Sequence, residues 1–145
     1  MLKTFFIPKL IQKYGPDFTE HIFCQDGASC HTAKTTLNLL EQHFGDNIIS
    51  NKIDNFWPPY SPDLNPCDFY LWGFLKDFVF KTSVSSIEEM KNKIISGCEQ
   101  VSESTCKKVI DNFNFRVNYC ATKRGKHFAH TMKKSSVLQT LNTNI

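Results

Sequence analysis

The chain has 145 residues, 41% of them hydrophobic, which suits one globular domain and does not suit a repeat array or a low-complexity polymer. No run of about eighteen apolar residues is present, so we expect no membrane span and no membrane partner. The net charge is +3, but residues 107–145 carry eight Lys/Arg against one Asp/Glu. Such a segment is typical either of a surface that faces a polyanion or of a solvated tail, and charge alone does not choose between them.

The cysteines form none of the close pairs that mark a zinc ribbon or a small disulfide framework. We expect them to be reduced and mostly buried thiols of an intracellular protein. The N-terminus agrees with this, because Pro8 and Lys9 interrupt its short apolar stretch before a signal-peptide pattern is completed. The six residues are Cys24, Cys30, Cys67, Cys98, Cys106 and Cys120.

The first part of the chain predicts a helix, a strand and a second helix. Residues 1–14 have apolar side chains at helical spacing up to a Gly-Pro pair, and Pro8 either kinks this helix or marks its start. Residues 20–25 predict a short buried strand whose end delivers Asp26 into a loop. Residues 32–44 repeat apolar positions every three or four residues until a glycine, as an amphipathic helix does.

A proline-rich loop separates this part from a helix that starts near Asp68. Residues 48–57 are expected to hold a second strand, around residues 53–57. Four prolines in residues 58–66 then exclude regular structure and predict a rigid, extended loop. Asn65 as cap, a proline after it and Asp68 in the first turn predict a helix start. Because this helix is apolar on nearly every side, we expect it to be buried.

Two further helices and a tail complete the predicted order. Ser86 and Glu89 have the spacing of a capping box that opens one helix. A long helix is predicted over residues 103–121, with Gly125 in the loop beyond it. Residues 131–145 are polar and without pattern, which predicts a disordered end.

Two motifs carry a resemblance to a known family. Residues 25–33 are QDGASCHTA, and residues 57–73 are WPPYSPDLNPCDFYLWG. In this order they closely resemble mariner-type DDE/D transposases, and weaker similarity extends over residues 1–131. The resemblance implies an α/β fold, a partial ribonuclease H-like fold that lacks its first strands and has a helix-rich C-terminal half. Residues 1–130 would be the truncated catalytic domain and residues 131–145 the tail.

The same resemblance assigns catalytic roles to two aspartates. By position, Asp26 and Asp68 correspond to the second and third carboxylates of the catalytic triad, and they would bind Mg²⁺ or Mn²⁺. Several converging carboxylates are what two-metal phosphoryl transfer on DNA requires. The first triad aspartate is expected on a strand that precedes the first helix in the family, and neither Asp17 nor Glu20 resembles it.

The resemblance implies three competing functions. The first is a transposase-derived nucleic-acid-binding protein whose ancestral role is metal-dependent DNA cleavage and strand transfer in the nucleus. With only two carboxylates we expect this chain to be inactive. The second is a catalytically dead DNA- or protein-binding module that uses the basic C-terminal region, and the third is a decayed or truncated fragment. Partners would be DNA and either a second copy or a full-length transposase, since an incomplete sheet exposes an edge.

Several residues have competing interpretations. Asp63 is an alternative to Asp68, but turn capping is the favoured role for it. His31 could contact a DNA phosphate or orient a metal ligand, although capping or packing beside the following helix is favoured. Trp57, Tyr60 and Trp72 could stack on bases, with core packing favoured for Trp72. His127 and His130 have metal-compatible spacing but lack a third ligand. The candidate DNA contacts are His31, Tyr60, Lys107, Lys108, Arg116, Lys123, Arg124 and Lys126.

Overall fold

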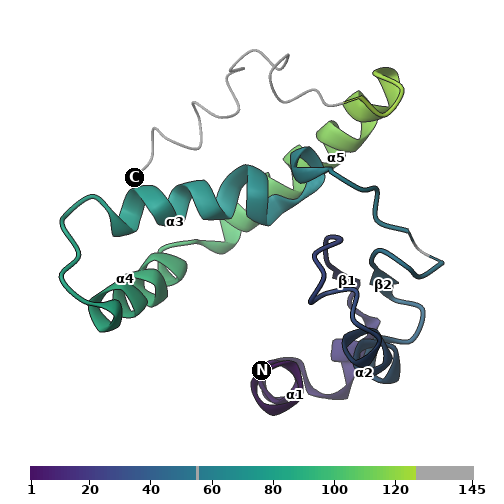
Figure 1. Ribbon diagram of the computed structural model, residues 1–145, viewed down its shortest axis with the longest axis horizontal. Coiled ribbons are helices and arrows are strands. Elements are labelled where there is room, and N and C mark those ends of the chain that lie inside the picture. Colours follow the sequence, from purple (N-terminus) through teal and green to yellow (C-terminus); the bar gives the residue numbers. More distant parts are fainter. Residues whose placement is uncertain (55, 127–145) are drawn as a thin grey trace. The chain divides into compact units, whose positions relative to one another are not determined.

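The structure, a computed structural model, describes residues 1–54 and 56–126. It divides the chain into two compact units, Met1–Tyr60 and Ser61–Ile145 (Figure 1). The boundary falls inside the proline-rich loop, within the stretch that we expected to be one domain. Both units are helix-rich, and the strands lie in the first, so the chain is mixed α/β as predicted.

The first unit begins with a helical segment that contains three kinds of helical turn. A π-helical turn, η1 (Leu2–Phe6), leads into α1 (Ile7–Tyr14), and a 3₁₀ segment, η2 (Gly15–Glu20), follows. Pro8 is the second residue of α1, directly after the π-helical turn, so helical backbone lies on both sides of it. The α-helical part therefore begins beside Pro8, while the helical segment as a whole begins at Leu2.

Two short parallel strands follow, β1 (Phe23–Cys24) and β2 (Ile48–Ile49), with α2 (Lys34–Phe44) between them. Gly45 ends α2 with a φ of 52°, as the glycine signal predicted. The second strand was predicted too late in the chain. β2 precedes residues 53–57, of which only Phe56 takes part, in an isolated bridge with Ser50.

The core of the first unit consists of Ile7, Phe18, Leu40, Phe44 and Ile48. These side chains come from α1, η2, α2 and β2, whereas η1 and β1 contribute no fully buried residue. Phe23 of β1 is only partly buried, but its ring lies 5.2 Å from that of Phe44. The core thereby holds the strand pair in place, and β1 ends two residues before Asp26.

The second unit consists of helices. A 3₁₀ turn, η3 (Pro62–Leu64), and a π-helical turn, η4 (Cys67–Leu71), precede α3 (Trp72–Val79), α4 (Ile87–Glu99) and α5 (Glu103–Thr122). In α3 and α4, which lie side by side (Figure 1), the missing side chain of Gly97 lets Leu75 and Phe78 approach. The expected burial of the helix after Asp68 on nearly every side is wrong: in α3 only Leu75 and Val79 are buried, and Trp72 is 55% exposed.

The capping box of α4 is confirmed in one half and shifted in the other. Ser86 Oγ accepts a hydrogen bond from the amide of Glu89, as predicted. The Glu89 carboxylate, however, accepts from the amide and hydroxyl of Ser85 rather than from the amide of Ser86, and it pairs with Lys93 at 2.9 Å. These bonds from Ser85 and Lys93 lower the pKa of Glu89 to about 2.

Acidification is expected to release this cap. The folded pKa of Glu89, about 2, lies below its ordinary value of 4.5, so the stability it contributes is present above pH 4.5 and is lost as pH falls towards 2. An NMR titration of the Glu89 carboxyl carbon should have its midpoint near 2. A midpoint near 4.5 would contradict the cap, and in Glu89→Gln the acid-induced loss of α4 helicity should be smaller than in the wild type.

The cysteines are free thiols, but the expected burial is wrong. Cys24, Cys30, Cys98 and Cys106 are exposed, and the other two are partly buried. Within the described residues, no helix is both long and apolar enough to cross a membrane. The tail predicted over residues 131–145 lies outside the described residues.

Candidate functional site

Asp26 lies at the point where the paired strands end. The amide of Gln25 donates to the carbonyl of Ile49 at 3.0 Å, the last backbone bond along this strand, and Asp26 is the next residue. Its Oδ1 accepts hydrogen bonds from the amide of Ala28 at 3.0 Å and from His31 Nδ1 at 2.6 Å. Both bonds fall on Oδ1, so among the described residues Oδ2 has no hydrogen-bond donor. One oxygen anchors the side chain and the other is open to a ligand.

The surroundings of Asp26 favour its charged form. The hydrogen bond from the Ala28 amide is the main cause that lowers the pKa of Asp26; partial burial opposes it, and His31 lowers the pKa further. Because a carboxylate only accepts, the Nδ1 atom of His31 carries the hydrogen, and Nε2 is directed away from this bond. The structure thus brings together two residues that the sequence singled out. This contact has the geometry of the ligand-orienting role of His31, which the sequence did not favour.

The loop between Asp26 and His31 is supported by a buried amide that the sequence reasoning missed. Gln25 Nε2 donates to the carbonyl of His31 and to Ser50 Oγ, both at 3.0 Å, and Ser50 is fully buried. A Cβ at Gly27 would lie 2.9 Å from the Asn51 side-chain nitrogen, so a side chain there would require the end of the Asn51 side chain to shift. The sequence signal for this support was Gln25 itself, a polar residue that follows the apolar middle of the predicted strand.

Replacing Gln25 by leucine is expected to lower the free energy of unfolding of the first unit by about 1–3 kcal/mol, because the His31 carbonyl and the Ser50 hydroxyl lose a buried donor. Urea unfolding followed by circular dichroism measures this loss. Gln42→Leu, an exposed position on α2, is the matched control. Equal unfolding midpoints for the two variants would refute the supporting role of Gln25.

Asp68 lies in the second unit, in the first turn of η4. Asn65 caps this helix, because its Oδ1 accepts from the amide of Cys67 at 3.1 Å and its carbonyl accepts from the amide of Asp68 at 2.9 Å. The predicted helix start is therefore confirmed. The side chain of Asp68 is exposed, whereas Asp63 is buried. Of the two acidic residues, Asp68 is thus the one accessible to a ligand.

Arg116 belongs to the interior, not to the basic surface for which it was predicted. It is 6% exposed and donates from Nη1 to the carbonyl of Asp63 at 3.0 Å and from Nε to Asn112 Oδ1 at 2.6 Å. Its guanidinium lies 4.2 Å from the centroid of the Phe69 ring. Burial lowers the pKa of Arg116, and the charge of Asp63 opposes this. Arg116 therefore joins the proline-rich loop to the helix that carries Asp68, and we drop it from the candidate DNA contacts.

The other candidates for DNA contact differ in exposure. Tyr60 is 88% exposed and has a positive φ of 53°, whereas Trp57 is 5% exposed and is not available for base stacking. Trp72, for which core packing was favoured, is exposed instead. His127 and His130, the weak zinc candidates, lie outside the described residues. The remaining candidate cations, which are all exposed, are Lys107, Lys108, Lys123, Arg124 and Lys126.

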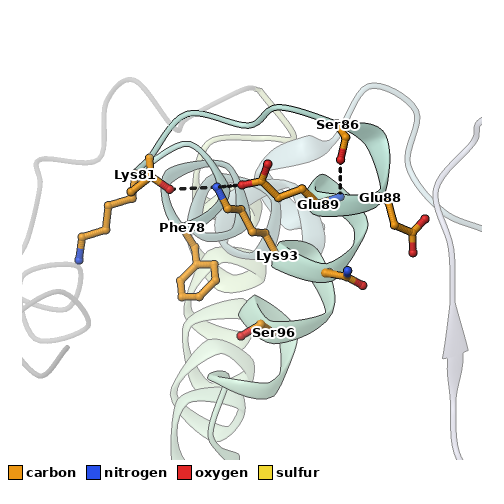
Figure 2. Close-up of a pocket in the computed structure, with 9 residues that line it drawn as sticks. Phe78, Lys81, Ser86, Glu88, Glu89, Lys93 and Ser96 are labelled. Atoms are coloured by element: carbon orange, nitrogen blue, oxygen red, sulfur yellow. Dashed lines mark hydrogen bonds and ion pairs between the residues drawn. The ribbon is translucent and has the colours of Figure 1, made fainter.

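A shallow pocket of about 650 Å³ lies beside α4, where the loop after α3 meets it (Figure 2). Figure 2 shows Lys93 directed towards Glu89, and the ammonium also donates to Thr82 Oγ1 and to the carbonyl of Ser83, each at 2.9 Å. These partners already satisfy the ammonium of Lys93 and the carboxylate of Glu89. We therefore assign no function to this pocket.

A hard divalent cation fits Asp26 as one ligand, because the carboxylate is ionised and has one open oxygen. Within residues 1–54 and 56–126, however, no three His, Cys, Asp or Glu side chains gather in a way that could hold a metal. Asp26 and Asp68 belong to different units. Asp26 and Asp68 are thus described as separate candidate ligands, one at the end of a strand and one in the first turn of a helix.

Comparison with protein families gives a match. The model of the DDE superfamily endonuclease family matches residues 2–91, more than half of the chain, and this segment includes both Asp26 and Asp68. No curated protein and no solved structure matches the chain. Enzymes of the family are generally dependent on a divalent metal and act on DNA. The chain belongs to the DDE superfamily endonuclease family, which confirms the transposase-related resemblance at the level of the superfamily.

Proposed function

We propose that the chain derives from a mariner-type transposase and that Asp26 and Asp68 are metal ligands of a site for DNA cleavage and strand transfer. The observation that carries the proposal is the state of Asp26: an ionised carboxylate at the end of a parallel strand, with one oxygen fixed and one open. Ligands at the carboxyl ends of parallel strands are typical of α/β enzymes. The membership of the DDE superfamily supports the reaction class.

The residues have distinct roles in this proposal. Asp26 and Asp68 would hold Mg²⁺ or Mn²⁺, which supplies activation of the attacking oxygen and stabilisation of the leaving oxygen. His31 would position Asp26 by fixing Oδ1, and Gln25 would fix the carbonyl of His31. On the same proposal the fold is ribonuclease H-like, the protein acts on DNA in the nucleus, and it associates with a second copy or a full-length transposase.

Metal binding is expected without DNA cleavage. Mn²⁺ should broaden the NMR signals of residues around Asp26 and Asp68, and Asp26→Asn and Asp68→Asn should each abolish the broadening at the substituted site. Asp77→Asn, an exposed aspartate on α3, is the matched control. On supercoiled plasmid with Mg²⁺ or Mn²⁺ we expect no nicking, because two carboxylates leave the metals undercharged. Broadening that is unchanged in both variants would refute the metal site, and nicking that Asp68→Ala abolishes would refute the expected inactivity.

A DNA-binding module without catalysis is the second candidate function. The exposed cations of α5 and the turn beyond it, Lys107, Lys108, Lys123, Arg124 and Lys126, favour it. Phosphate contacts would make DNA affinity fall steeply with salt. On duplex DNA, the logarithm of the binding constant should fall against the logarithm of the salt concentration with a slope of about 0.9 per neutralised phosphate. DNA binding that is salt-dependent, and unaffected by Asp26→Asn and by EDTA, would support this function over the metal-dependent one.

A further inference from the structure

The C-terminal half of α5 carries a row of two aromatic rings and a cation. Phe115 and Tyr119 are stacked, with ring centroids 6.0 Å apart and an interplanar angle of 21°. The Lys123 ammonium lies 5.3 Å from the centroid of the Tyr119 ring. Residues four apart lie on one face of a helix, so the three side chains lie one after another along the same face.

This row is not part of the core. The residues of α5 that are buried are Val109 and Arg116, which mark the face packed against the rest of the unit. Phe115 is 52% exposed, and Tyr119 is partly buried. An aromatic pair that keeps half of one ring in water contributes less to folding than a buried pair would, and it presents a flat face to a ligand.

The charge at the C-terminal end of the row is positive. Residues 112–126 contain Arg116, Lys123, Arg124 and Lys126, and the nearest acidic residue, the exposed Asp111, lies one turn before Phe115 at the other end of the row. Arg116 is internal, so three exposed cations lie within four positions at the C-terminal end of α5. Their combined positive charge exceeds the negative partial charge of the helix C-terminus, which is about half an elementary charge. In Figure 1 the last turns of α5 extend past the other helices of the second unit.

We propose that Phe115, Tyr119 and Lys123 form a binding site for unpaired nucleotides of DNA. A base would stack on the aromatic pair, while Lys123 and Arg124 would bind the neighbouring phosphates. Bases inside a duplex already stack on their neighbours, so a flat aromatic surface favours single-stranded segments over paired ones. The identity of the ligand as DNA rests on the proposed function; the site itself does not involve Asp26, Asp68 or a metal.

The test measures the affinity of the full chain for a fluorescein-labelled oligothymidine strand and for a duplex of the same length, by anisotropy in EDTA. Loss of one base stack costs about 1–3 kcal/mol, so Phe115→Leu and Tyr119→Leu should each weaken single-strand binding by about 5- to 150-fold and leave duplex binding unchanged. Tyr119→Phe keeps the ring and should keep the affinity. Lys123→Gln should reduce the salt slope on the single strand by about 0.7.

Phe80→Leu, a 62% exposed phenylalanine at the end of α3, is the matched control and should bind like the wild type. Wild-type affinity in Phe115→Leu, an equal loss on single strand and duplex, or a loss in Tyr119→Phe as large as in Tyr119→Leu would each overturn the stacking site. Tighter binding of oligouridine than of oligothymidine would overturn the choice of DNA. Because EDTA removes metals, the result is independent of Mn²⁺ binding, so failure of the stacking site and failure of the metal site are distinguishable.

Discussion

Arg116→Leu is expected to lower the free energy of unfolding of the second unit by about 3 kcal/mol. The variant removes two hydrogen bonds from a charged donor and leaves the Asp63 carbonyl and Asn112 Oδ1 without that partner. It also removes the guanidinium from the face of Phe69. Because Asp63 lies in the proline-rich loop and Phe69 follows Asp68, the loss should loosen the segment that presents Asp68.

Two measurements separate this local effect from general destabilisation. Urea unfolding gives the change in free energy, and hydrogen exchange of the Phe69 amide, which donates to the carbonyl of Asn65, gives the opening of the helix start. Arg116→Lys keeps the charge, but a lysine cannot reproduce the planar fork, so it should recover only part of the stability. Lys108→Leu, an exposed position of α5, is the control. If Arg116→Leu unfolds at the same urea concentration as this control, the anchoring role is wrong.

Local signals predicted the ends of the helices well. Gly45 stops α2 because it adopts a positive φ, and Ser86 opens α4 through its hydroxyl. Each of these effects acts within one turn of the residue that causes it. A sequence pattern contains all the information that such an effect requires.

Contacts between distant segments were not predictable in the same way. The position of β2 depends on pairing of Phe23 with Ile48, and no residue near Ile48 signals that partner. The role of Arg116 depends on Asp63, fifty-three positions away. Counting charges placed this arginine on the surface, because composition does not report which cations are internal.

The sequence named the residues of the candidate site, but it did not name the side chains that hold the surrounding loop in place. Asp26, His31 and Asp68 were named from the motifs, and the structure brings the first two into hydrogen-bond contact. Gln25 and Ser50, which hold the loop between them, were not named. Their side chains matter only because residue 50 returns beside residue 25 in the fold, a relation that no local pattern contains. Whether these residues bind metal stays a prediction.

Substitution of the two tryptophans is expected to change the free energy of unfolding by very different amounts. Trp57 is 5% exposed, and its backbone amide donates to the carbonyl of Ser50 at 2.9 Å. Trp57→Ala should lower the free energy of unfolding by about 3–5 kcal/mol through the cavity it leaves. Trp72 is 55% exposed, and Trp72→Ala should change it by about 0.5 kcal/mol at most. Urea unfolding of both variants checks the contrast.

Fluorescence provides the independent measurement, because the chain contains two tryptophans and each single variant reports on the other. In Trp72→Phe, emission from Trp57 should be blue-shifted and resist acrylamide; in Trp57→Phe, which keeps an aromatic ring and most of the packing, emission from Trp72 should be red-shifted and readily quenched. Equal quenching in the two variants would show that Trp57 is accessible and would restore it as a base-stacking candidate. With Trp57 internal, Tyr60, 88% exposed three residues later, is the base-stacking candidate of this segment that DNA can reach.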